Sequence, residues 1–177
     1  MTPARVTPTP RAKSSEGPPV APGVTDALDK GVMRVVITRV AEASVTVDGD
    51  LVSQLPRPGL LVLVGIARGD GPQDARAVAA KTWSLRILRD ERSASDTNAP
   101  ILVISQFTLH AATRRGRRPS WSAAASGDVS EPLVELFCRE LEALGAEVGR
   151  GRFGAEMQVA SVNDGPITIL IDTQDWR

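Results

Sequence analysis

The chain has 177 residues, of which 42% are hydrophobic and 24% charged, as in an ordinary globular protein with one domain. Basic and acidic side chains number 21 each, so no global field attracts nucleic acid and any RNA contact depends on a local patch. A single cysteine, Cys138, and a single histidine, His110, exclude an internal disulfide and a Cys/His zinc site. Because no apolar stretch approaches the roughly 20 residues that span a bilayer, we expect a cytoplasmic protein with no membrane partner. We also expect no metal and no cofactor.

Residues 1–32 differ in composition from the rest of the chain. Six of the 13 prolines fall there, among Thr, Ser and Ala and without an aromatic residue. Such a segment cannot bury enough apolar surface to offset the entropy lost on ordering. We predict a disordered, Pro-rich extension at 1–32 and one folded domain at 33–177.

The first part of the domain predicts three strands. Residues 33–46 are rich in Val, Ile and Thr in rough alternation, which is typical of a strand. Asp48-Gly49-Asp50 predicts a hairpin turn, because Asp and Gly tolerate the left-handed backbone of tight turns. A second strand follows at 51–55. Residues 60–66 are continuously apolar over a strand length, which indicates a strand buried on both faces.

The middle of the chain predicts a helix, a strand and two loops. Residues 72–88 are expected to be helical, with Pro72 in the first turn, where no amide donor is needed. The polar segment 90–100 predicts a loop, and 101–109 a further strand. Residues 113–120 form a basic, glycine-containing loop.

The last part of the chain predicts a helix and two strands. Apolar residues repeat with helical spacing through 131–144, and Ser130 and Gly145 are suited to begin and end that helix. Strands are expected at 155–162 and 167–172, with a turn at Asn163-Asp164-Gly165-Pro166 between them. Hairpins interspersed with two helices predict an α+β domain with a largely antiparallel sheet.

Two segments carry residues suited to a functional site. Residues 105–109 place Ser, Gln and Thr at the end of an apolar strand, where backbone amides become free to bind a substrate. Residues 163–168 contain a Gly-Pro step, in which a cis peptide is accessible and the main chain is open to close approach. Taken singly, the first segment is more simply explained as ordinary edge residues and the second as a plain turn.

Together the two segments resemble the paired signature motifs of bacterial-type D-aminoacyl-tRNA deacylases. The first reads SQFTL at 105–109 and the second reads NDGPIT at 163–168. The resemblance covers 33–172, and further matching stretches are VITRV at 36–40, GLLVLVGI at 59–66, GRRPSW at 116–121 and FGAEMQV at 153–159.

The resemblance implies a barrel-like dimeric α+β domain that hydrolyses the ester bond of D-aminoacyl-tRNA. It implies that Gly165 and Pro166 form a Gly-cis-Pro step which enters the partner subunit's pocket and excludes an L side chain, while glycyl-tRNA is accepted. The backbone amides of Phe107 and Thr108 are then an oxyanion hole. The remaining implied roles are support from Ser105, contact with the aminoacyl end by Gln106, and substrate binding by Met157, Asn163, Thr168, Arg118 and Pro119.

The nucleophile is left open by the sequence. Thr108 needs a neighbouring base to act as one, and His110 is placed on the same face of the predicted strand. Direct attack by water, assisted by the ribose hydroxyl of the tRNA, is the favoured mechanism, because the ester is already activated. A Cys138–His110 catalytic pair requires that the fold bring the two together.

Other functions compete with this one. Arg114, Arg115, Arg117 and Arg118 either contact acceptor-stem phosphates or form a solvated charge run. A non-catalytic RNA-binding module is disfavoured by the zero net charge and by the lack of an aromatic stacking platform, and no DNA partner is expected. Two further candidates are an editing-like module, as in some threonyl-tRNA synthetases, and a relaxed-chirality deacylase with a trans Gly165–Pro166 bond.

Overall fold

In the computed structural model, residues 32–176 are described. The extension predicted at 1–32 therefore lies outside the described residues, except for its last residue. The strands are β1 (Arg34–Val47), β2 (Asp50–Gln54), β3 (Gly59–Gly65), β4 (Ile101–Ser105), β5 (Val148–Arg150) and β6 (Gln158–Asp172). The helices are α1 (Pro72–Ser84), α2 (Ala94–Thr97) and α3 (Gly127–Ala143), with 3₁₀ turns at Arg89–Glu91, Phe107–His110 and Thr173–Trp176.

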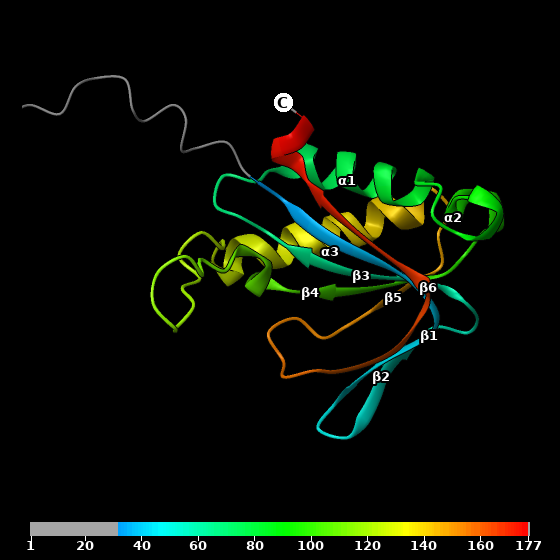
Figure 1. Cartoon of the computed structure of the whole chain (residues 1–177), viewed down its shortest axis with the longest axis horizontal. Helices are drawn as coiled ribbons and strands as arrows, with labels where there is room; N and C mark the ends of the chain where they lie inside the picture. The colour runs from blue at the N-terminus through cyan, green and yellow to red at the C-terminus, as the bar shows by residue number, and fades with distance from the viewer. Residues whose placement is uncertain (1–31, 177) are drawn as a thin grey trace, which may run out of the picture.

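The strands form one mixed sheet in the order β2-β1-β3-β4-β5, with β6 paired to β1 outside this path (Figure 1). Strand β1 is antiparallel to β2, β3 and β6, whereas the β3–β4 and β4–β5 pairs are parallel. The predicted α+β class is confirmed, with two parallel pairs that the hairpin pattern did not indicate. Parallel pairing follows from the helical crossovers, since α1 and α3 each carry the chain back before the next strand.

Strand β1 links the parts of the sheet, because it pairs with three other strands. One edge pairs with β3 along residues 34–40 and with β2 along 44–47, while the other pairs with β6 from Arg34 to Thr46. Met33 and Thr173 exchange main-chain and hydroxyl hydrogen bonds at the same end. The first and last strands of the domain are thereby joined along their length.

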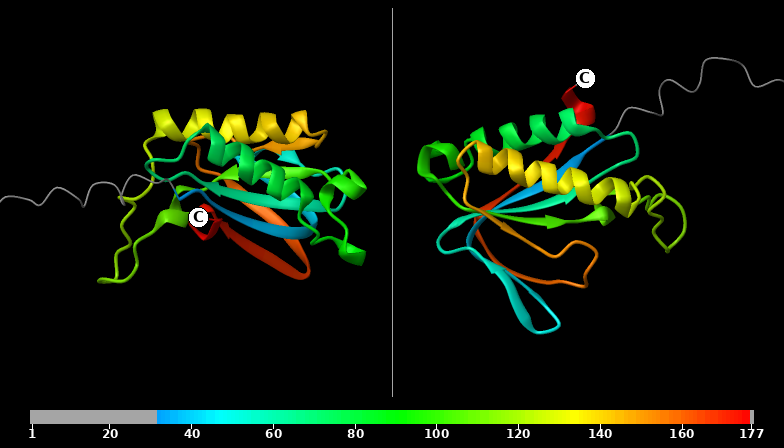
Figure 2. Two further views of the ribbon diagram at one scale, coloured as in Figure 1. Left: turned by 90° about the horizontal axis from the view of Figure 1, so that it is seen from above. Right: turned by 180° about the vertical axis from the view of Figure 1, so that it is seen from behind.

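Two apolar clusters pack on the two faces of the sheet. Helices α1 and α3 lie side by side on one face (Figure 2), and their apolar stripes pack against Val35, Val62 and Val64 in the larger cluster. Leu61 and Ile104 belong to the smaller cluster on the opposite side. The predicted burial of residues 60–66 on both faces is confirmed. No helix of the described part is long and apolar enough to cross a membrane.

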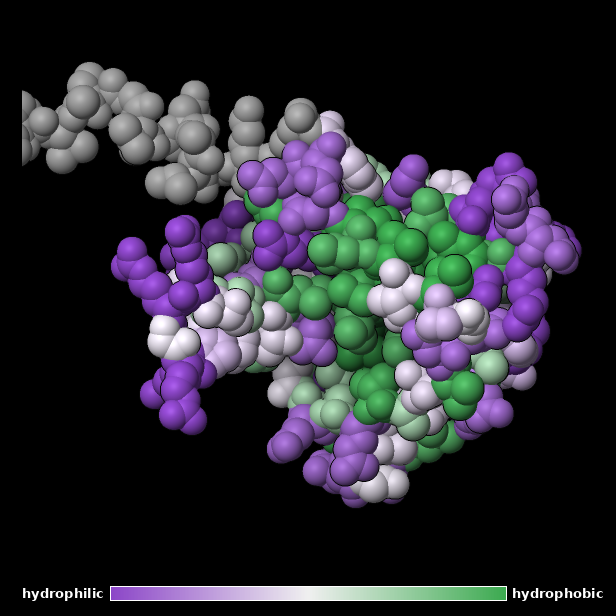
Figure 3. Space-filling model, in the orientation of Figure 1, coloured by the Kyte–Doolittle hydropathy of each residue, from purple (hydrophilic) through white to green (hydrophobic). Residues whose placement is uncertain are grey.

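The face of the sheet away from α1 and α3 exposes apolar side chains along β6. Val159, Val162 and Leu170 are all exposed, and Leu170 has 61% of its surface accessible. The space-filling view has apolar residues gathered over the middle of the face on which β6 lies (Figure 3). A surface of this kind is typical of an interface with another protein.

Two predicted helices and one predicted loop differ from the structure. Helix α1 ends at Ser84 rather than at residue 88, because Leu85 is extended and the following apolar residues pack on the core. The predicted loop 90–100 contains α2, which begins with a capping box in which Ser93 and Asp96 bind each other's main-chain amides. Helix α3 begins at Gly127, so Ser130 is not its cap and instead donates its hydroxyl to the Ala125 carbonyl oxygen, 3.2 Å away.

The predicted turn at residues 163–166 is wrong. Strand β6 runs continuously from Gln158 to Asp172, and both halves pair in the same direction with β1. The register shifts on either side of Val40, so the segment around Gly165 is an irregular stretch within one strand. Gly165 has φ +120, a conformation that a side chain disfavours. The Gly-Pro step thus interrupts the regular pairing of β6 with β1 but does not reverse the direction of the chain.

Candidate active site

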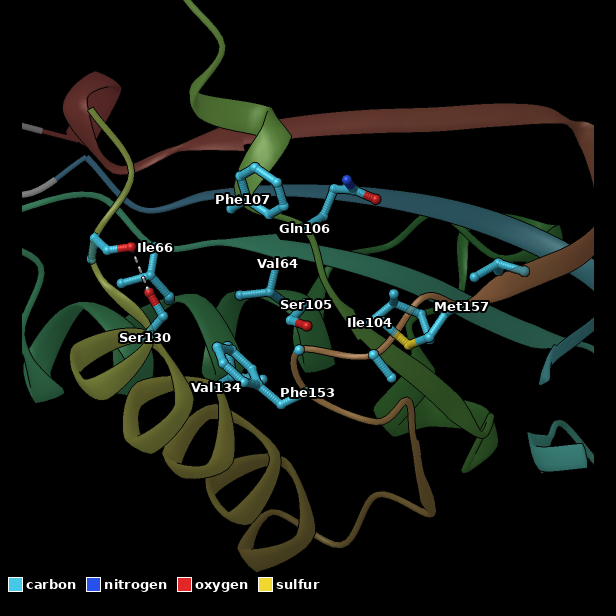
Figure 4. Close-up of a pocket in the computed structure, with 15 residues that line it drawn as sticks. Val64, Ile66, Ile104, Ser105, Gln106, Phe107, Ser130, Val134, Phe153 and Met157 are labelled. Carbon is cyan, nitrogen blue, oxygen red and sulfur yellow. Dashed lines mark hydrogen bonds between the residues drawn. The ribbon is translucent and has the colours of Figure 1, made fainter. Parts of the chain in front are cut away.

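The ends of β3 and β4 open into a cavity of about 410 Å³. The first turns of α3 and the chain that leads into β6 form its other walls (Figure 4). Its lining is Val64, Ile66, Ile104, Ser105, Gln106, Phe107, Ala125, Gly127, Ser130, Val134, Phe153, Gly154, Ala155, Met157 and Val159. An apolar cavity of this size with a few polar groups has the character of a small-molecule site.

Ser105, Gln106 and Phe107, three of the predicted site residues, line this cavity together, although the strand that leads to them ends at Ser105. The Gln106 amide donates to the Val64 carbonyl oxygen at 2.7 Å, and the chain then turns at Phe107–His110. The strand predicted to continue to residue 109 is therefore wrong in its second half. Gly65 permits the turn, because a Cβ there would lie 2.9 Å from the Leu109 Cβ.

The turn leaves two backbone amides without a partner in it, those of Phe107, which lines the cavity, and of the adjacent Thr108. Its first main-chain hydrogen bond runs from the Leu109 amide to the Gln106 carbonyl oxygen, at 3.2 Å. The amides of Phe107 and Thr108 precede that bond, and the first amides of a helical turn have no partner within it. Adjacent free donors next to a cavity are the arrangement that stabilises a developing oxyanion.

The turn also separates Thr108 from His110. The Gln106 side-chain amide is hydrogen-bonded to the Thr108 hydroxyl, and neither Thr108 nor His110 lines the cavity. His110 is buried, with 4% exposure, and its Nε2 lies near Gly65. The predicted placement of both residues on one strand face is wrong, because this segment is not a strand. No contact between them supports a Thr–His nucleophile pair among the described residues.

Burial of His110 makes the stability of the fold depend on pH. Burial lowers the pKa of His110, and the nearby Arg34 acts in the same direction. The unfolded chain therefore binds a proton near pH 6.5 that the folded protein does not bind, so stability is full above that pH and falls as pH decreases through it. We expect His110→Gln to remove a slope of up to about 1.4 kcal/mol per pH unit from urea unfolding below pH 6.5. A slope equal to that of the unaltered protein would contradict this assignment.

Cys138 is not a nucleophile in this fold. Its thiol is buried in α3, and burial raises its pKa to about 12. A thiol with that pKa is protonated at neutral pH, whereas the thiolate is the reactive form. A Cys138–His110 catalytic pair is thereby disfavoured.

Met157, for which the resemblance implied substrate binding, also lines the cavity. A Cβ on residue 151 would lie 2.6 Å from the Met157 sulfur. Gly151, which has no side chain, therefore makes room for the thioether. Figure 4 places Phe153 and Val134 on the α3 side of the same space. The sequence motifs did not point to Ser130 or Val134, and only the helical periodicity of α3 signalled that such side chains face inward.

Four predicted residues of β6 lie together but outside this cavity. The Asn163 side-chain amide donates to the Thr168 hydroxyl at 3.2 Å, and its carbonyl oxygen accepts from the Ile167 amide. Gly165 and Pro166 are exposed between them. No peptide bond of the described residues is cis, so the expected cis Gly165–Pro166 bond is contradicted. A Gly-Pro bond favours trans by only about 0.5–1 kcal/mol, so the residue pair alone does not dictate cis.

Arg39 binds the main chain next to the Gly-Pro step. Its Nε donates to the Asp164 carbonyl oxygen at 2.9 Å, and a Cβ on Gly165 would collide with its guanidinium. Arg118 and Pro119 lie on an exposed loop and do not line the cavity. Of the predicted site residues, the strand end and Met157 are thus brought together, whereas β6 and the loop are not.

Comparison with known proteins gives a consistent family. The model of the D-Tyr-tRNA(Tyr) deacylase family matches residues 36–172. A D-aminoacyl-tRNA deacylase of Cutibacterium acnes is 61% identical over 145 residues, covering 82% of this chain and 100% of that protein. One from Thermobifida fusca is 56% identical over 140 residues, covering 79% and 99%.

Two solved structures are similar to this chain in fold. A c-Myc DNA unwinding element binding protein superimposes with a TM-score of 0.73 and 34% identity, covering 78% of this chain and 97% of that one. A probable eukaryotic D-amino acid tRNA deacylase has a TM-score of 0.69 at 16% identity, covering 80% and 99%, which shows the shared fold. By the family match over its folded domain and its identity to full-length relatives, the chain belongs to the D-Tyr-tRNA(Tyr) deacylase family.

Proposed function

We propose that the protein hydrolyses the ester bond of D-aminoacyl-tRNA and releases free tRNA and the D-amino acid. The observation that carries the proposal is the cavity at the end of β4, where Ser105, Gln106 and Phe107 meet Met157 beside two free amides. The names of the curated relatives, with more than half of the residues identical, support the same activity. We expect such an enzyme to act in the cytoplasm, where it proofreads the substrates of translation.

The geometry favours attack by water over a covalent intermediate. The Phe107 and Thr108 amides would stabilise the negative charge that develops on the carbonyl oxygen, at about 3–4 kcal/mol per donor. Met157 and Phe153 would pack on the terminal adenosine in the apolar part of the cavity. Gln106 would hold the aminoacyl end, with its side chain fixed by the hydrogen bond to Thr108.

The role of the Thr108 hydroxyl is tested by removing it. We expect Thr108→Ala to keep substantial activity, because water attack needs the amide of residue 108 and not its side chain. Deletion of a true nucleophile instead lowers kcat by several orders of magnitude. Single-turnover hydrolysis of D-tyrosyl-tRNA measures the difference, and near-total loss in Thr108→Ala with an intact fold would establish a threonine nucleophile.

We infer that the active form is a homodimer in which Gly165 and Pro166 enter the partner's cavity. Within one chain these residues are exposed and do not line the cavity, while β6 presents exposed apolar side chains. Their carbonyl oxygens would face the α-carbon of the substrate and leave no room for an L side chain. Asn163 and Thr168 would keep the segment in place through their hydrogen bonds, and glycine would pass as a substrate.

Paired assays of D-tyrosyl-, L-tyrosyl- and glycyl-tRNA test this function. We expect hydrolysis of the D-tyrosyl and glycyl esters and sparing of the L ester, with sedimentation measuring a dimer. The trans Gly165–Pro166 bond favours a second candidate, a relaxed-chirality deacylase that also accepts L-alanyl-tRNA. Cleavage of L-alanyl-tRNA would support that candidate, and no hydrolysis of any ester would refute both.

A further inference from the structure

A second hollow lies beside the active cavity, with a volume of about 620 Å³. Its lining is Arg68, Gly69, Phe107, Trp121, Ala124, Ala125, Ser126 and Val129. Phe107 and Ala125 also line the active cavity, so the two spaces meet at these residues. We call this hollow the outer groove. The part of a ligand that extends from the active cavity past Phe107 would therefore lie in the outer groove.

The outer groove displays an aromatic pair. Phe107 and Trp121 contact each other edge to face, with ring centroids 5.5 Å apart and an angle of 81° between the rings. They are 55% and 41% exposed, although the whole chain contains only six aromatic residues. The expectation that the chain lacks an aromatic stacking platform is therefore corrected. Spacing along the sequence hid the pair, since the two rings meet only after the turn at 107–110.

The charged residue that lines the groove is basic, and further arginines lie near it. Arg68 lines it, is exposed and has no ion pair within residues 32–176. The arginines at 114, 115, 117 and 118 are exposed on the loop that leads directly to Trp121. Helix α3 begins at the groove, and the first amides of a long helix attract phosphate. Basic groups around an exposed aromatic ring are the features that bind single-stranded nucleic acid.

We propose that the outer groove binds the unpaired 3′ strand of the tRNA, with the base of the nucleotide before the esterified adenosine stacked on Trp121. The edge-to-face contact with Phe107 holds the indole ring in place, and the 41% exposure of Trp121 gives the base a surface on which to stack. Arg68 neutralises the phosphate that joins the two nucleotides. This inference rests on the proposed deacylase function, because it takes the adenosine to occupy the neighbouring cavity.

The test compares a substrate that reaches the groove with one that does not. D-tyrosyl-tRNA carries the preceding nucleotide, whereas adenosine esterified with D-tyrosine ends inside the cavity. We expect Trp121→Ala to lower the ratio of kcat/KM for the tRNA to that for the nucleoside ester roughly 5- to 150-fold, mainly through KM. Trp121→Phe should lose less, because it keeps a ring. Trp176→Ala is the matched control, since Trp176 is 44% exposed and lies outside the groove.

Each outcome decides one question. An unchanged ratio in Trp121→Ala, or a dimer that dissociates in that variant, would overturn the groove and leave the deacylase function standing. No hydrolysis of either ester by the unaltered protein would instead refute the proposed function. Arg68→Gln adds an independent readout, because loss of one phosphate contact should reduce the slope of log KM against log salt by about 1 for the tRNA alone. Lys81→Gln, on the exposed side of α1, should leave that slope unchanged.

Discussion

The Phe107→Pro variant is expected to have a kcat about 10²–10³-fold lower than that of Phe107→Ala. This is the usual effect of losing one hydrogen-bond donor to the oxyanion. Both variants lose the ring, but only proline loses the main-chain N–H. The position accepts proline, because Phe107 begins its turn and the preceding Gln106, with φ −143 and ψ 80, lies outside the helical region that a following proline disfavours. Single-turnover hydrolysis of D-tyrosyl-tRNA by the pair isolates the amide.

The comparison needs evidence that both variants fold alike. Equal Tm values and equal binding of free adenosine in the cavity provide it. If Phe107→Pro then hydrolyses the ester as fast as Phe107→Ala, the Phe107 amide makes no contact with the reacting oxygen. The proposed oxyanion site would in that case have to lie elsewhere.

Replacing Gly59 by alanine is expected to destabilise the fold by on the order of 3 kcal/mol, because overpacking and a broken main-chain hydrogen bond act together. A Cβ at residue 59 would collide with the Pro100 carbonyl oxygen, which accepts the Leu60 amide at 3.0 Å. That oxygen lies at the start of the β3–β4 pairing and cannot move without opening it. Thermal unfolding should show a fall in Tm of roughly 6–12 °C.

A second glycine provides the matched control. Gly127 begins α3, and a Cβ there would meet only Phe153, at an ordinary 3.8 Å. Gly127→Ala should leave stability unchanged or raise it by up to about 1 kcal/mol, since alanine favours a helix. A Tm for Gly59→Ala equal to that of Gly127→Ala would show that the contact with Pro100 relaxes freely.

Local patterns predicted most elements of the fold because they are properties of one segment. Alternation and turn chemistry placed β1, the Asp48-Gly49 turn and β2, where Asp48 and Gly49 both have positive φ as such a turn requires. The continuous apolar run at 60–66 indicated β3 correctly. Helix ends were less predictable, because α3 begins in a segment of Ser, Gly and Asp that is typical of caps and loops alike.

The errors occurred where a distant partner decides the conformation. Asn163-Asp164-Gly165-Pro166 has the composition of a turn, but β1 pairs with both halves of β6, so the chain continues as one irregular strand and does not reverse. Three-residue β5 carries too little pattern to be recognised and exists because β4 offers it an edge. The same limit applies to the site. Its strand-end residues were visible in the sequence, whereas Ser130 reaches the cavity, and Trp121 the outer groove, only through tertiary packing.

The pairing of β1 with β6 has a consequence for synthesis of the chain on the ribosome. Arg34 and Asp172 face each other across that pair although 138 residues separate them. At about 5–20 residues per second, β1 therefore emerges roughly 7–30 s before its partner strand is made. During that interval one edge of the longest early strand is open to wrong pairing. We therefore expect the nascent domain to need protection until its final strand has emerged.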